Sequence, residues 1–88
     1  MRVEVARISA KGSIRREMVD TASRKDAARW EELVAEAGLD SPPPYRPAPG
    51  QPVYLIEAGE QAFAVAEQDL TGPLRELVMT VLAEGDTT

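Results

Sequence analysis

The sequence predicts an α+β fold in which the chain runs ββαββα, a four-stranded antiparallel sheet with two helices packed on one face. Two β-rich hairpins are each followed by one amphipathic helical segment. The 88 residues suffice for one domain with a modest core. Hydrophobic residues make up 43% of the chain and charged residues 28%, as in folded globular proteins. Four antiparallel strands covered by two helices is the economical packing of these elements.

The first hairpin is expected from two β-rich segments, residues 2–8 and 14–19. The residues between them, 9–13, read Ser-Ala-Lys-Gly-Ser, which is typical of a hairpin loop. Within the first segment, apolar and charged residues alternate at the start. The alternation shifts at Ala6 and Ile8, which indicates a β-bulge.

The first helix is expected to begin at Ser23, because Asp26 three residues later completes a capping-box-like pattern. Gly38 is expected to end it. We expect Trp30 to anchor the core rather than to form a platform for a ligand. The apolar residues of this segment lie on one helical stripe: Ala27, Trp30, Leu33, Val34 and Ala37.

A proline-rich segment, residues 41–52, is expected to connect the first helix to the third strand as a stiff, extended loop. Residues 42–45 match the Pro-Pro-x-Tyr ligand of WW domains, and residues 44–47 match an SH3-ligand pattern. Both patterns are short and common, so we favour the connector. Tyr45 is kept as a candidate partner-binding residue.

The second hairpin can be placed in register from its turn. Residues 59–60 are Gly-Glu, a two-residue loop of the type II′ pattern. This turn pairs Ile56 with Phe63 and Tyr54 with Val65, which make a bulky apolar face expected to join the core. The reverse face is expected to be open and only lightly charged. It comprises Val53, Leu55, Glu57, Ala62, Ala64 and Ala66.

The second helix is expected to have Thr71 or Gly72 as its N-cap and Pro73 in its first turn. Gly85 is expected to end it. Its apolar residues fall at i, i+3, i+4, i+7 and i+8 and form a full core stripe: Leu74, Leu77, Val78, Val81 and Leu82.

The boundaries of the fold follow from these elements. Residues 1–85 are expected to form one domain and residues 86–88 to fray. No apolar segment is long enough to cross a membrane, and the first ten residues lack the uninterrupted apolar run of a signal peptide, so we expect a cytoplasmic protein.

The composition disfavours catalysis. The chain contains neither cysteine nor histidine, which excludes disulfides, thiolate nucleophiles and the Ser-His-Asp triad. Carboxylates, lysine and tyrosine are left for proton transfer, and a chain this small can hardly build the pocket that would tune their pKa values. We therefore expect no enzyme and no cofactor. The acidic residues around the second hairpin lack the spacing of a calcium loop and are interpreted as solvated: Glu57, Glu60, Glu67 and Asp69.

The charge pattern narrows the class of partner. The formal net charge is −5, so nucleic acid and anionic membranes are disfavoured. Arg15 and Arg16 are adjacent in a predicted strand, so their side chains should point to opposite faces and not clamp a phosphate. With nucleic acid and anionic membranes disfavoured, we expect the partner to be a protein.

Several motifs occur in order along the chain: residues 3–7, Arg-Arg-x-x-Val-Asp-Thr at 15–21, residues 28–37, a triple proline at 42–44, and Asp-Leu-x-x-Pro-Leu-Arg-x-Leu-Val at 69–78. In these motifs, which span most of its length, the chain resembles the emfourin-type family (protealysin inhibitors). The resemblance implies the same fold and a function as a protein inhibitor of thermolysin-like zinc metallopeptidases.

The first turn departs from this resemblance. Residues 9–12 read Ser-Ala-Lys-Gly, where a Gly-Gly-Phe-like turn is expected of family members. This departure bears on inhibition and leaves the fold inference unchanged.

The resemblance also suggests how a blocking segment would be built. A catalytic zinc keeps one coordination position open, and a chain without histidine or cysteine can offer it only oxygen. Thermolysin-like enzymes, as the resemblance implies, favour a bulky apolar residue just after the cut bond. One candidate segment is Ile8, Ser9, Ala10 and Lys11, and the other is Leu39 with Asp40. Leu39 could instead pack back on its own helix, and cover of the cleft without contact to the metal is the alternative to both.

A second class of function stays open. The chain could be a non-inhibitory interaction module or a weak homodimer that uses the open sheet face around Leu55.

Overall fold

The computed structural model describes residues 1–46 and 48–87. The element order ββαββα and the α+β class predicted from the sequence are confirmed. Two short 3-10 helices, η1 (Thr21–Ser23) and η2 (Glu67–Asp69), precede the two α-helices. The main elements are β1 (Arg2–Ile8), β2 (Ile14–Asp20), α1 (Ala27–Glu36), β3 (Val53–Ala58), β4 (Gln61–Ala66) and α2 (Gly72–Glu84).

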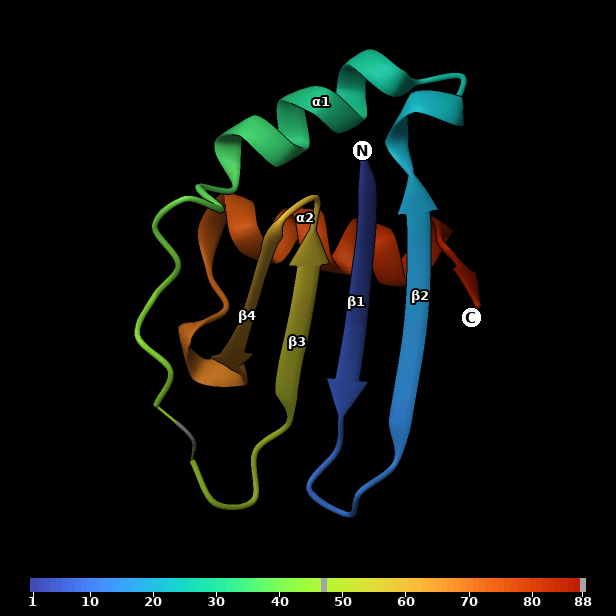
Figure 1. Ribbon diagram of the computed structural model, residues 1–88. Coiled ribbons are helices and arrows are strands. Elements are labelled where there is room, and N and C mark those ends of the chain that lie inside the picture. The colour runs from blue at the N-terminus through green and yellow to red at the C-terminus, as the bar shows by residue number, and fades with distance from the viewer. Residues whose placement is uncertain (47, 88) are drawn as a thin grey trace.

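All strands form one antiparallel sheet in the order β4-β3-β1-β2-β5 (Figure 1). The first strand of the chain thus lies in the centre and joins the two hairpins. The fifth strand, β5 (Asp86–Thr87), pairs with the end of β2. Most of the segment expected to fray therefore adds a short edge strand. Thr88, from the same expected tail, and Pro47, from the expected SH3-ligand pattern, lie outside the described residues.

The predicted bulge in β1 is wrong. The pairing between β1 and β2 is continuous from Arg2 opposite Asp20 to Ile8 opposite Ile14. The alternation shifts for another reason: Ala6 lies on the open face between two longer side chains of the neighbouring strands and is only 5% exposed. A small apolar residue is sheltered there without any change of register.

The predicted register of the second hairpin is confirmed. Ile56 is opposite Phe63, and Tyr54 is opposite Val65. Gly59 has a φ of +59°, whereas no residue other than glycine has a positive φ in the described chain. A positive φ at the first loop position alone is the signature of the II′ turn, whose twist matches that of the strands.

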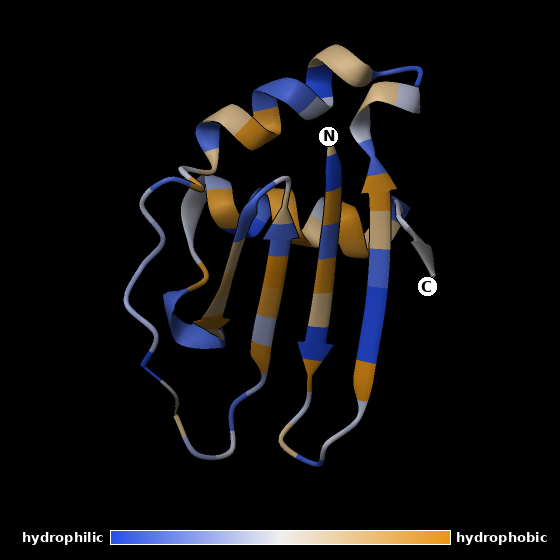
Figure 2. Ribbon diagram, viewed as in Figure 1, coloured by the Kyte–Doolittle hydropathy of each residue, from blue (hydrophilic) through white to orange (hydrophobic). Residues whose placement is uncertain are grey.

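The core lies between the sheet and the two helices. In Figure 1, α2 crosses behind β1 and β2, and α1 crosses the upper ends of the strands. The predicted core stripe of α2 is buried throughout, and Trp30 of α1 is buried as expected. Figure 2 shows β1 alternating between hydrophobic and hydrophilic residues, as a strand with one core face should. No helix among residues 1–46 and 48–87 covers the opposite face of the sheet.

The start of α1 differs from the prediction. Its N-cap is Asp26, and Ser23 belongs to η1. The Asp20 carboxylate accepts a hydrogen bond from the Ala22 amide at 3.2 Å, so a 3-10 turn forms directly after β2 and the α-helix begins later. The Asp26 carboxylate accepts a hydrogen bond from the indole N–H of Trp30 at 3.1 Å. Asp26 therefore orients the core tryptophan from the helix start.

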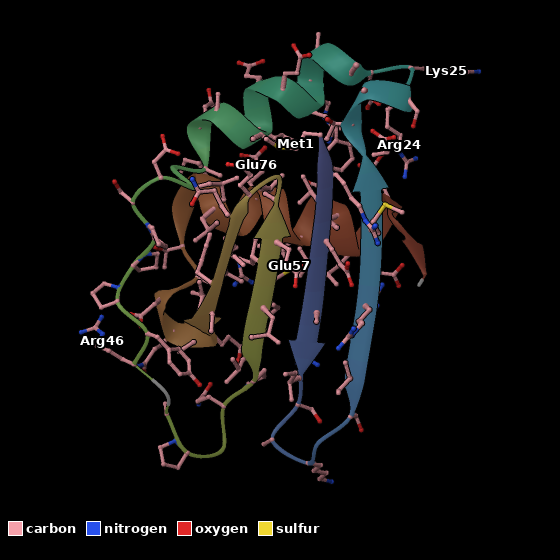
Figure 3. All side chains as sticks on the ribbon, viewed as in Figure 1. Met1, Arg24, Lys25, Arg46, Glu57 and Glu76 are labelled. Carbon is pink, nitrogen blue, oxygen red and sulfur yellow. The ribbon has the colours of Figure 1, made fainter. Side chains whose placement is uncertain are left out.

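The C-terminal end of α2 is held by three arginines of the first half of the chain. Arg15 donates to the carbonyl of Leu82. Arg24, which is labelled in Figure 3, donates to the carbonyl of Glu84 at 2.8 Å. Arg29 lies 3.4 Å from the carboxylate of Glu84. Cations at this end complement the helix dipole and satisfy carbonyls that have no partner within the helix. These contacts join the two ββα halves.

Candidate functional site

The loop between β1 and β2, residues 9–13, is closed by its own hydrogen bonds at the lower end of the sheet in Figure 1. The Ser9 amide donates to the Ser13 carbonyl at 2.9 Å, and the Gly12 amide donates to the Ser9 carbonyl at 2.9 Å. The Ser9 hydroxyl accepts a hydrogen bond from the Ser13 amide at 3.0 Å. Ser9, a candidate oxygen donor, is therefore used to shape the loop.

The tip of this loop faces solvent. Ala10 and Lys11 are exposed, and no hydrogen bond in residues 1–46 and 48–87 uses their carbonyl oxygens. Ile8 is half-buried, while Ile14, directly opposite it, is 57% exposed. Sequence reasoning missed Ile14. The sequence feature that could have identified it is its place opposite Ile8, in the strand pair next to the loop 9–13.

The second candidate segment is divided between the core and the surface. Leu39 is 6% exposed and belongs to the hydrophobic core. It is a structural residue and not a side chain available to an enzyme cleft. Asp40 is exposed and lines a shallow hollow of about 410 Å³ with Glu60 of the β3–β4 turn and Gln61 at the start of β4.

The structure does not bring the two candidate segments together. Met1, which precedes β1, lines the same hollow as Asp40, whereas the loop 9–13 follows the other end of β1. A strand of seven residues is about 20 Å long. The loop tip and Asp40 thus lie at opposite ends of the sheet, and they define two separate surfaces.

Tyr45 is exposed in the proline-rich segment. The next residue, Arg46, forms an ion pair with Asp69 of η2 at 2.6 Å, and Gln68 donates to the Arg46 carbonyl at 3.5 Å. The Asp69 side chain is only 10% exposed, so its interpretation as a solvated charge is wrong. It fastens the connector to the second half of the chain. In the described part of the chain, no three potential ligand side chains gather where they could hold a metal ion.

The fourth candidate surface is the side of the sheet away from α2, seen toward the viewer in Figure 1. This open face consists of the even-numbered residues of β1, β2 and β4 and the odd-numbered residues of β3. Leu55 lies near its middle and is 38% exposed. Arg16 points to this face and Arg15 to the opposite one, as predicted.

Comparison of the chain with known protein families, with curated proteins and with solved structures finds no match. The resemblance stated above therefore rests on the sequence motifs alone. Among the described residues, the longest helices fall short of the length and apolar character that a membrane crossing needs.

Proposed function

We propose that this chain is a non-catalytic protein that binds and blocks a thermolysin-like zinc metallopeptidase. The ordered sequence motifs motivate the choice of target. The observation that carries the proposal is the hydrogen-bonded loop 9–13, which projects from one end of the sheet with an exposed tip. A cytoplasmic location belongs to the same proposal and stays a prediction.

The loop has the parts that a blocking segment requires. The carbonyl oxygens of Ala10 and Lys11 are oxygen donors that the described part of the chain leaves without a hydrogen bond. Ile14 supplies an exposed bulky apolar side chain at the base of the same loop. Three internal hydrogen bonds already order the loop. Its binding to a peptidase would therefore cost less conformational entropy than the binding of a flexible loop of the same length. The blocking contact then uses backbone oxygens and not the hydroxyl of Ser9.

The experiment that tests this proposal is titration of several thermolysin-like peptidases with the purified chain. We expect stoichiometric loss of peptidase activity at micromolar inhibitor, with the chain recovered uncleaved by mass spectrometry. Full activity of every peptidase in the panel would overturn the proposal.

Matched variants at the two ends of the sheet locate the contact. Ser9→Ala removes the acceptor of the Ser13 amide and loosens the loop, so we expect inhibition to weaken at least fivefold, which corresponds to about 1 kcal/mol. Ser9→Thr keeps the hydroxyl and should retain inhibition. Asp40→Ala, at the other end, should leave it unchanged. If Asp40→Ala alone weakened inhibition in a folded protein, the contact would lie beside the β3–β4 turn instead.

A further inference from the structure

The open face carries an unusual arrangement of charges. Glu4 and Glu57 are directly opposite each other on β1 and β3, and like charges at such positions repel. Arg2 lies 3.5 Å from Glu4. Glu57 and Arg16 have neither an ion pair nor a side-chain hydrogen bond with any residue that the structure describes. The face thus presents one anion and one cation without partners.

The shape of this face would also fit the same face of a second copy. A small hollow lies over Ala6, whose methyl group sits between the longer side chains of Arg16 and Leu55. Glu57 stands on the rim of the same hollow, and its place on β3 is labelled in Figure 3. One patch therefore holds a protruding apolar side chain, a depression, a free cation and a free anion. A two-fold symmetric contact needs both halves of each interaction on one surface.

We propose that the open face binds a second copy of this chain in a two-fold symmetric, face-to-face contact. In this contact, Arg16 of each copy forms an ion pair with Glu57 of the other. The two Leu55 side chains pack near the symmetry axis over the hollows at Ala6. Glu4 keeps Arg2 of its own chain as its partner.

The strand register is consistent with this geometry. Arg16 is opposite Ala6, and Glu57 is opposite Glu4, so the two free charges flank β1 diagonally. The midpoint between them falls on β1 at the level of Val5, midway between Glu4 and Ala6. In a face-to-face contact the two-fold axis lies parallel to the two sheets. An axis that runs over this midpoint and exchanges Arg16 with Glu57 also passes close to Ala6 and to Leu55, which is opposite Ala6 on β3.

The charge of the whole chain favours this face over the rest of the surface. With a net charge of −5, two copies repel each other in general. The open face is closer to balance than the chain as a whole. Two arginines accompany two glutamates (Arg2, Arg16, Glu4 and Glu57), and the remaining carboxylate, Asp20, lies 4.0 Å from the N-terminal ammonium. Two copies that meet on this face therefore repel each other less than they would on the acidic remainder of the surface.

The size of the face sets the expected strength. Four strands spaced about 4.8 Å apart and about 20 Å long cover roughly 400 Å² per copy. Stable interfaces bury about 800 Å² per partner, so the dimer should be weak and concentration-dependent. This inference does not rest on the proposed inhibition, since the loop 9–13 lies at the end of the sheet and not at the centre of its face.

Sedimentation equilibrium of the full chain from about 10 µM to 1 mM tests the proposal. We expect the average mass to rise from 9.6 kDa toward twice that value. Arg16→Glu and Glu57→Arg should each weaken association at least tenfold, because each places like charges across both symmetric contacts. The double variant restores opposite charges and should bring association back to within about threefold of the unmodified chain.

Two charge reversals on the helices are the matched controls. Arg75→Glu and Glu32→Arg are exposed sites that carry the same changes of net charge, and they should alter association far less. A chain that stays monomeric at 1 mM overturns the proposal. The proposal is also overturned if the open-face and helix charge reversals weaken self-association equally, or if the double variant does not regain self-association. If the unmodified chain is monomeric and an open-face reversal abolishes inhibition of a peptidase, the face belongs to that peptidase and the homodimer is wrong.

Discussion

Gly85 ends α2 with a φ of −76°, an ordinary backbone conformation for any residue. Its lack of a side chain matters because the chain passes very close to its neighbours there. A Cβ at this position would lie 2.5 Å from the carbonyl oxygen of Val81 and 3.1 Å from the Cβ of Glu17. The space that glycine leaves lets the chain leave α2 and run directly along β2.

Gly85→Ala should therefore destabilise the fold. The added methyl group overlaps backbone atoms that cannot move independently, and overpacking of this kind costs about 1–3 kcal/mol. In a domain of this size, 1 kcal/mol corresponds to a fall in Tm of about 4–8 °C, which thermal unfolding followed by circular dichroism would detect. An unchanged Tm would mean that the end of α2 shifts to make room.

For single residues, the sequence predicts the core position of Trp30 but not the role of Asp26, which accepts its hydrogen bond. Helical spacing is enough to place Trp30 in the core. It cannot decide which of Asp20, Ser23 and Asp26 caps which turn, because all three are good capping residues. The 3-10 turn after β2 takes Asp20, and Asp26 is left to accept from the tryptophan. Leu39 shows the same limit, since its burial depends on how α1 sits on the sheet.

Among the elements, β3 gives the sharpest test of the fold. Ile56 is fully buried, whereas its neighbour Leu55 is 38% exposed. Ile56→Asp places a charge without a partner in the core and should unfold the domain. Leu55→Asp should change the free energy of unfolding by less than about 1 kcal/mol, although it should weaken self-association. Thermal unfolding of the two variants checks this, and equal losses of stability would contradict the register of the hairpin.

The hairpins were the most predictable elements and the sheet order the least. The turn at residues 59–60 sets the register of β3 and β4 through local geometry alone. The pairing of β1 with β3 joins segments far apart in the sequence, and several arrangements satisfy the same apolar pattern. Strand β5 has two residues and no pattern of its own. For the same reason the sequence could not show that the loop 9–13 and Asp40 lie at opposite ends of the sheet.

At the scale of the molecule, the fold should unfold as one unit. The core includes residues of β1 to β4 and of both helices, and the three arginines tie α2 to the first half of the chain. In urea, the fluorescence of Trp30 and the far-ultraviolet circular dichroism should follow one transition, with a slope of about 1 kcal/mol per molar. Trp30 is the only tryptophan, so the fluorescence reports on the surroundings of one core side chain of α1. Separate midpoints for the two probes would show that the two halves unfold independently.

The central place of β1 has a consequence for the order of folding. This strand finds β2 within a few residues, but its other neighbour, β3, ends at Ala58. During synthesis, one side of β1 therefore stays without its hydrogen-bonding partner until β3 (Val53–Ala58) has left the ribosome. Non-local pairing of this kind slows folding, because a long loop must close before the contact forms. Strand β1 is thus made before both of its partners but completed only when β3 has been made, and it presents an open strand edge while it waits.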